Sequence, residues 1–142
     1  MKTYWGDMHS HCAISYGYGT PKRALDNARQ HLDFCSITGH AFWPDMPMDI
    51  KQHNNVILTH FGGFEKLQHF WPDLMAAIKA ANKPGEFITF PSYEWHSMKY
   101  GDYNVYFNTD DAPLLNAPTL PELARATGDL KRMLLPHHCA YI

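Results

Sequence analysis

The sequence has few cysteines, and its thiols form no recognisable pair. Cys12, Cys35 and Cys139 are widely spaced and belong to no Cys-x-x-Cys motif, which excludes a disulfide framework or a thiolate zinc knuckle and indicates a reducing compartment. The sequence also lacks a run of about 18 apolar residues, the length that a membrane span requires, and the segment after Met1 lacks the apolar stretch of a signal peptide. We therefore expect a cytoplasmic protein with no membrane partner.

Basic residues are also scarce and scattered. Lys and Arg number 12 against 14 Asp and Glu, which gives a net charge of −2, and no basic run is longer than a dipeptide. This pattern lacks the electrostatic footprint of nucleic-acid binding. The 8 Phe, 8 Tyr and 4 Trp residues do not alternate with basic ones, so we expect them in the core and in the wall of a site.

Histidine, by contrast, is abundant, with 10 residues. His9 and His11 lie in a segment that reads as a strand, and because side chains on a strand alternate, both point to the same face. Two neutral imidazoles facing one way form a chelate for zinc-, iron- or manganese-type ions. The alternative for this pair is a buried position in which backbone partners satisfy both rings.

The rest of the sequence alternates strand-like and helical segments, without internal repeats or linkers, as expected of one α/β domain. Residues 41–59 carry turn-forming Pro and Asn and are predicted to be a long insertion loop. Strands that alternate with helices imply a parallel sheet, whose carboxyl ends gather functional residues. We expect helices over 21–31, 64–81 (kinked or divided at Pro72) and 119–128, and further strands over 33–38, 87–90, 102–107 and 131–136.

Several residues of metal-ligand type lie at or beside these later strands. Glu94 stands between two aromatics, where a carboxylate is costly to bury unless it meets a cation, and its natural role is to bridge two metals. His40 is either a ligand or a satisfied core histidine, and Asp102 is either a ligand or a carboxylate that caps a turn. Consecutive residues of a strand point apart, so we expect only one of His137 and His138 to face the site, with His138 preferred and the other in support.

The other candidates are predicted to be structural. Cys12 could be a nucleophile beside His11, but no oriented base accompanies it, so we expect a small buried residue. Five further histidines are assigned to the surface or to packing, and His96 is the first of them to be reconsidered. They are His31, His53, His60, His69 and His96.

Four motifs, in register over nearly all 142 residues, resemble the PHP (polymerase and histidinol phosphatase) superfamily, in particular a branch with Tyr-Glu-Trp and Asn-Val-Tyr-Phe segments. The resemblance implies a distorted, TIM-like (β/α)7 barrel. It also implies one to three divalent ions, usually zinc, manganese or iron, and hydrolysis of a small-molecule phosphoester by a metal-activated water. The four motifs are Gly6–His11, Thr38–His40, Tyr93–Trp95 and Leu135–His138.

The resemblance also implies roles for individual residues. His9 and His11 would bind a first metal, and Glu94 would bridge it to another. His40 and His138 would serve neighbouring positions. We expect Glu94 and His138 to be the catalytic residues, and the metal ligands to come from His9, His11, His40, Glu94, Asp102, His137 and His138.

The sequence departs from the PHP pattern at specific positions. Tyr16 replaces an acidic or imidazole ligand, and a phenol binds metal only when deprotonated. Gly39 replaces a carboxylate, which leaves the position around His40 depleted. Asp102 stands where the related branch commonly has a histidine, and the C-terminal Asp-x-His motif is absent from the sequence.

The length of the sequence limits the fold that we expect. We count about five strands, taken to be parallel, whereas a closed barrel usually needs about 200 residues or more. We therefore expect residues 1–142 to form a single PHP-like domain, a partial barrel that is incomplete at its C-terminus, or a shortened form whose open sheet edge is covered in a homo-oligomer. The alternative function is an impaired member that binds metal or ligand without turnover.

Overall fold

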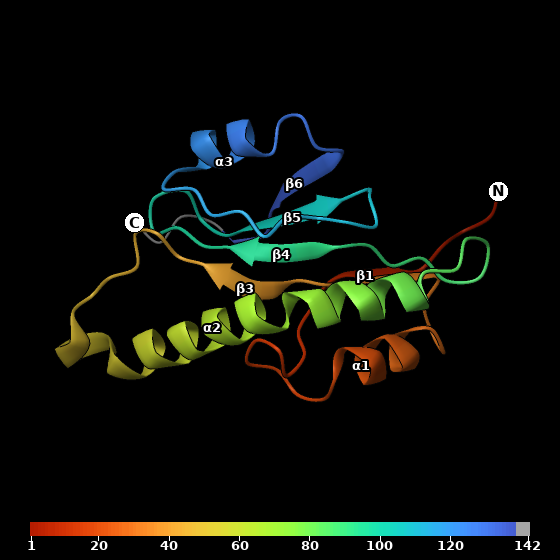
Figure 1. The fold of residues 1–142 in the computed structure, drawn as a ribbon, viewed down its shortest axis with the longest axis horizontal. Coiled ribbons are helices and arrows are strands. Elements are labelled where there is room, and N and C mark those ends of the chain that lie inside the picture. Colours follow the sequence, from red (N-terminus) through yellow and green to blue (C-terminus); the bar gives the residue numbers. More distant parts are fainter. Residues whose placement is uncertain (139–142) are drawn as a thin grey trace.

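Six strands and three helices form the part of the chain that the structure, a computed structural model, describes, namely residues 1–138 (Figure 1). The long helix α2 runs beside β3 and also packs on α1, whereas α3 lies near β5 and β6 on the opposite side. The elements in chain order are β1 (Gly6–Ser10), α1 (Pro21–Ala28), β2 (Phe34–Ile37), β3 (Gly39–Phe42), α2 (Ile50–Ala81), β4 (Ser92–Trp95), β5 (Tyr103–Phe107), α3 (Leu120–Ala126) and β6 (Arg132–Pro136).

The strands form two sheets rather than one, and the predicted partial (β/α)7 barrel of five parallel strands is wrong. β1 and β2 make a parallel pair, and β3, β4, β5 and β6 make a mixed sheet in that order. Only β3 and β4 are parallel within it, because β5 is antiparallel to both of its neighbours. Residues 96–102 connect β4 to β5, and this connection is shorter than the dozen or so residues that a parallel crossover needs, so the chain turns back.

The two short helices begin where the sequence predicts. Thr20 caps α1, accepting a hydrogen bond from the backbone N–H of Arg23 at 3.2 Å, and Pro21 takes the first helical position. Thr119 and Glu122 form the predicted capping box of α3, with the Thr119 hydroxyl donating to the Glu122 carboxylate at 2.6 Å. Local capping chemistry therefore fixes both helix starts.

Helix α2 begins well before its predicted start, so the insertion loop over 41–59 is wrong for much of its length. Ala41 and Phe42 belong to β3, and α2 runs from Ile50 to Ala81 with Asp49 as its N-cap. Its irregular residue is His53 (φ −125°, ψ 22°), rather than a position at the predicted Pro72. No helix among residues 1–138 combines the length and apolar character needed to cross a membrane.

Strand β4 turns its core side chains to one face of the sheet and Glu94 to the other face. Tyr93 and Trp95 are both fully buried. The Tyr93 hydroxyl donates to the Leu115 carbonyl at 2.9 Å, and Trp95 Nε1 donates to the Ala117 carbonyl at 3.0 Å. Because side chains on a strand alternate, Glu94 between them points to the opposite face, where β3 places His40 beside it in register.

Strand β6 forms the outer edge of the mixed sheet. It pairs with β5 on one side, and no strand within residues 1–138 pairs with its other side. Met133 and Leu135 are exposed on this strand. An edge of this kind is a place where a second chain can add, so its coverage in a homo-oligomer stays a prediction.

Candidate metal centre

The His9 and His11 side chains converge as the strand period predicts. Their Nε2 atoms lie 3.3 Å apart at the end of β1. On its other side, His9 Nδ1 lies 2.6 Å from the Thr38 hydroxyl, which comes from the link between β2 and β3. A second contact on the opposite ring nitrogen fixes the ring orientation, so that His9 Nε2 is the nitrogen presented to a ligand.

Glu94 lies where the imidazoles meet. Its side chain is 1% exposed, and its Oε2 is 3.2 Å from His40 Nδ1 and 3.8 Å from His11 Nε2. Its Oε1 is 2.9 Å from His137 Nε2. Oε2 is buried and has no hydrogen-bond donor among the described residues. A buried carboxylate oxygen among imidazole nitrogens is an arrangement that a cation stabilises.

His137 and His138 both face the centre, so the expectation that only one would do so is wrong. His137 contacts Glu94, as given above, and His138 Nδ1 lies 2.9 Å from Asp102 Oδ2. The two rings stack with centroids 3.8 Å apart. Strand alternation does not apply to this pair, because β6 ends at Pro136.

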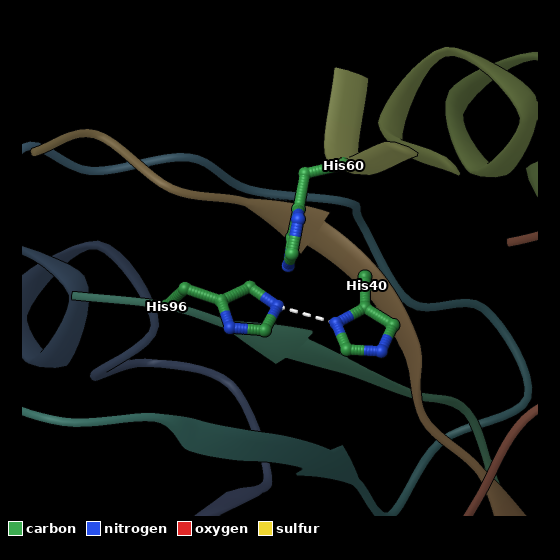
Figure 2. Close-up of side chains that lie close together, drawn as sticks. All are labelled: His40, His60 and His96. Carbon is green, nitrogen blue, oxygen red and sulfur yellow. Dashed lines mark hydrogen bonds between the residues drawn. The ribbon is translucent and has the colours of Figure 1, made fainter. Parts of the chain in front are cut away.

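His60 and His96, assigned to surface or packing from the sequence, also reach the centre. His96 follows β4, and its Nε2 lies 2.6 Å from His40 Nδ1. His60 points from helix α2 toward the space between these two rings, as Figure 2 shows. The Tyr16 hydroxyl lies 2.6 Å from His40 Nδ1 and 3.3 Å from His60 Nε2. Three residues outside the PHP-like motifs, His60, His96 and Tyr16, therefore surround His40.

The described side chains form three groups whose ligand atoms lie within 4.8 Å of one another and that could hold a metal ion. All seven side chains that the sequence predicts as metal ligands are found in these groups. The groups are His9, His11 and Glu94; Glu94, Asp102, His137 and His138; and His40, His60 and His96.

Burial sets the charge state of these side chains. It lowers the pKa of His9 to about 4, assisted by the neighbouring His11 and His137, and it also lowers the pKa of His11, His40 and His60. The same burial, together with the charge of Asp102, raises the pKa of Glu94 to about 9. The short His–Glu94 contacts are therefore neutral contacts at neutral pH, and the imidazoles keep the lone pairs that bind metals. A bound cation would favour ionised Glu94.

Of the other histidines considered, His31 and His69 are exposed and His53 is half-buried. None of the three belongs to a metal-compatible group among the described residues. Cys12 is fully buried, and burial raises the pKa of its thiol. This environment makes Cys12 a weak nucleophile, in line with its predicted packing role.

Gly39 faces helix α2, which explains the absence of a side chain at this position. A Cβ on Gly39 would lie 2.8 Å from Cδ1 of the fully buried Leu67. His40 faces away from Leu67 because it is the next residue of β3. The carboxylate of the PHP pattern is thus incompatible with the position of α2.

We expect Gly39→Asp to lower the free energy of unfolding by about 3 kcal/mol, through overpacking and an unpaired buried carboxylate. Gly62→Asp is the matched control, because a Cβ on Gly62 has nothing within 4 Å. Urea denaturation followed by circular dichroism measures both variants. Equal stability of the two variants would contradict the close packing of α2 on Gly39.

Comparison with protein-family models gives no match for this sequence, and comparison with curated proteins gives none either. The function of the centre is therefore inferred from its side chains and their geometry.

Proposed function

We propose that the protein is a metal-dependent hydrolase, with its centre built around Glu94. The observation that carries this proposal is the buried Oε2 of Glu94, which lies 3.2 Å from His40 Nδ1 and lacks a hydrogen-bond donor within residues 1–138. A carboxylate in this setting stays ionised when divalent cations bind beside it. Its two oxygens also contact different histidines, as a bridging ligand requires.

Two of the groups have the mixed ligand set that suits hydrolytic metals. His9, His11 and Glu94 would hold one ion, and Glu94, Asp102 and a histidine after β6 would hold another. Imidazole combined with carboxylate suits zinc, manganese or iron(II). Such ions supply Lewis-acid stabilisation of phosphoryl oxygens and activation of a water for attack.

His138 is the residue that we propose as the general acid. Its side chain is 57% exposed, whereas Asp102 beside it is 2% exposed. An ionised Asp102 can only accept a hydrogen bond, so the contact of 2.9 Å between its Oδ2 and His138 Nδ1 requires the hydrogen on Nδ1. A histidine held in this way and reached by solvent can take up a second proton on Nε2 and pass that proton to a leaving group.

The substrate class rests on the sequence motifs. The segments Gly6–His11, Thr38–His40, Tyr93–Trp95 and Leu135–His138 resemble those of PHP phosphoesterases. We therefore propose a small-molecule phosphoester as the substrate.

A second candidate is a protein that binds metal without turnover. It is favoured by Tyr16, whose ring stacks on His40 with centroids 3.8 Å apart and whose hydroxyl contacts His40 Nδ1. A neutral phenol is a poor ligand in place of an acid or an imidazole, and it limits access to His40. A panel of phosphomonoesters and phosphodiesters with added Mn²⁺ or Zn²⁺ separates the two candidates, because only the hydrolase releases phosphate or alcohol.

Elemental analysis tests the metal directly. Protein prepared without chelators should contain a divalent transition metal, and the double change His9→Ala with His11→Ala should remove at least one equivalent, because it deletes two of three ligands of one group. The matched control is His31→Ala with His69→Ala, which removes two exposed histidines. A metal content unaffected by the first pair, or no transition metal in the wild type, would refute the proposal.

A further inference from the structure

The group formed by His40, His60 and His96 differs from the other two because it contains no carboxylate. Its three rings come from β3, from helix α2 and from the segment just after β4 (Figure 2). His40 Nδ1 and His96 Nε2 lie 2.6 Å apart, and His60 Nε2 lies 3.3 Å from the Tyr16 hydroxyl, which itself contacts His40. The nitrogen atoms therefore converge on one small volume.

The tautomer of His60 directs a lone pair into this volume. His60 Nδ1 lies 2.7 Å from the backbone carbonyl of Val56, one turn earlier in α2. A carbonyl can only accept a hydrogen bond, so Nδ1 carries the hydrogen and Nε2 carries the lone pair. Proteins commonly orient a metal-binding histidine through such a contact on its other nitrogen.

A carboxylate lies beside the other nitrogen of His96. Its Nδ1 lies 3.1 Å from Asp102 Oδ1, on the side of the ring away from His40. An imidazole nitrogen beside a carboxylate favours the N–H form, so Nε2 of His96 presents its lone pair to His40.

Several polar atoms crowd around a single nitrogen of His40. His40 Nδ1 is 2.6 Å from His96 Nε2 and 3.2 Å from Glu94 Oε2, and it can carry only one hydrogen. One hydrogen on His40 Nδ1 cannot serve both of these acceptors, and the buried Glu94 Oε2 has no hydrogen-bond donor among the described residues. A divalent cation accepts several lone pairs at once and removes this conflict.

We propose that His40, His60 and His96 bind a divalent transition metal at a site of their own, separate from the two carboxylate-containing groups. Three neutral imidazoles without a carboxylate favour Zn²⁺, Co²⁺, Ni²⁺ or Cu²⁺ over Mn²⁺ and Mg²⁺. This site does not depend on the proposed hydrolase activity, because its ligands can bind a metal whether or not a substrate is turned over.

Helix α2 is the element that completes this site, and a glycine permits its approach. A Cβ on Gly63 would lie 2.7 Å from Cδ1 of the Tyr16 ring, which stacks on His40. Trp43 packs against His60 with ring centroids 4.9 Å apart and forms an aromatic wall beside it. A metal held here would tie α2 to the mixed sheet, since His60 lies on the helix and His40 on β3.

The experiment is a titration of the full chain, stripped of metal, with Zn²⁺ and with Co²⁺. Bound metal is counted by elemental analysis after dialysis, and visible absorption reports the Co²⁺ environment. In His60→Phe, which keeps a ring to pack against Trp43, we expect one metal equivalent to bind at least about 100-fold more weakly, with loss of its Co²⁺ band. Mn²⁺ should not occupy this equivalent in the wild type.

Two comparisons separate this site from its neighbours. His9→Ala with His11→Ala should lose a different equivalent and keep the His60-dependent Co²⁺ band. His69→Phe, an exposed histidine on the same helix, should match the wild type. Circular dichroism checks folding, and His60→Gln is the second variant if His60→Phe does not fold. Zn²⁺ binding by a folded His60 variant that equals that of the wild type in number and affinity would overturn the proposal.

Discussion

Glu94→Gln should remove metal from both carboxylate-containing groups and reduce hydrolysis by about 1,000-fold or more, the equivalent of about 4 kcal/mol of transition-state stabilisation. Glutamine keeps the size of the side chain but cannot carry the negative charge that offsets two divalent cations. Its amide N–H₂ would also donate a hydrogen bond to the nitrogen lone pair of His137, which lies 2.9 Å from the present carboxylate. Metal content and phosphoester turnover measure the two effects.

The matched control is Glu65→Gln, an exposed carboxylate on α2 that belongs to no metal-compatible group. It should leave metal content and turnover within about twofold of the wild type. Surface substitutions away from buried groups and metal ligands rarely change the stability of a protein. Metal binding by Glu94→Gln that equals that of the control would contradict the bridging role of Glu94.

The strand period was sufficient to predict the His9 and His11 pair, because their convergence depends only on local alternation. The predicted site at Asp102 is different, since this residue reaches the centre through a feature that the sequence analysis assigned wrongly. It lies just before β5, which is antiparallel to β4. The start of an antiparallel strand lies at the same edge as the end of its neighbour, so Asp102 reaches the centre although the parallel barrel is wrong.

His96 could have been found from the same alternation. It stands two residues after Glu94, and a strand over these residues would turn both side chains to one face. The predicted strand over 87–90 obscured this relation, because in the structure β4 begins at Ser92, after Pro91. Phe87 and Ile88 make only isolated bridges, with Lys83 and Phe34.

Local patterns do not predict that His60 reaches the centre, because they predict a loop over residues 41–59, directly before it. Prolines and the pair Asn54 and Asn55 favour turns, yet α2 already begins at Ile50. The buried residues Ile57 and Phe64 pack together with Met46 in a small separate cluster. Tertiary packing of this kind overrides weak local propensity, and only the folded chain reveals it.

Zn²⁺ should strongly stabilise the protein against heat. The centre gathers imidazoles and two carboxylates, all buried or half-buried except His138, and a ligand that binds only the folded state stabilises it in proportion to the logarithm of its concentration. At a free Zn²⁺ concentration of about 1,000 times Kd the gain is about 4 kcal/mol, which corresponds to a rise in Tm of about 10 °C for a chain of this size. Differential scanning calorimetry of metal-stripped protein with and without Zn²⁺ measures the shift.

The choice of cation and of variant makes this shift specific to the centre. Mg²⁺ at the same concentration should change Tm little, because it prefers oxygen ligands and dehydrates reluctantly, whereas seven of the eight candidate side chains other than Glu94 are histidines. His31→Ala with His69→Ala should keep the full Zn²⁺ shift. The shift should shrink in Glu94→Gln, which leaves only the His40, His60 and His96 group with its ligand set unchanged. A Zn²⁺ shift of the same size in Glu94→Gln and in wild type would place the stabilising metal outside the two groups that Glu94 joins.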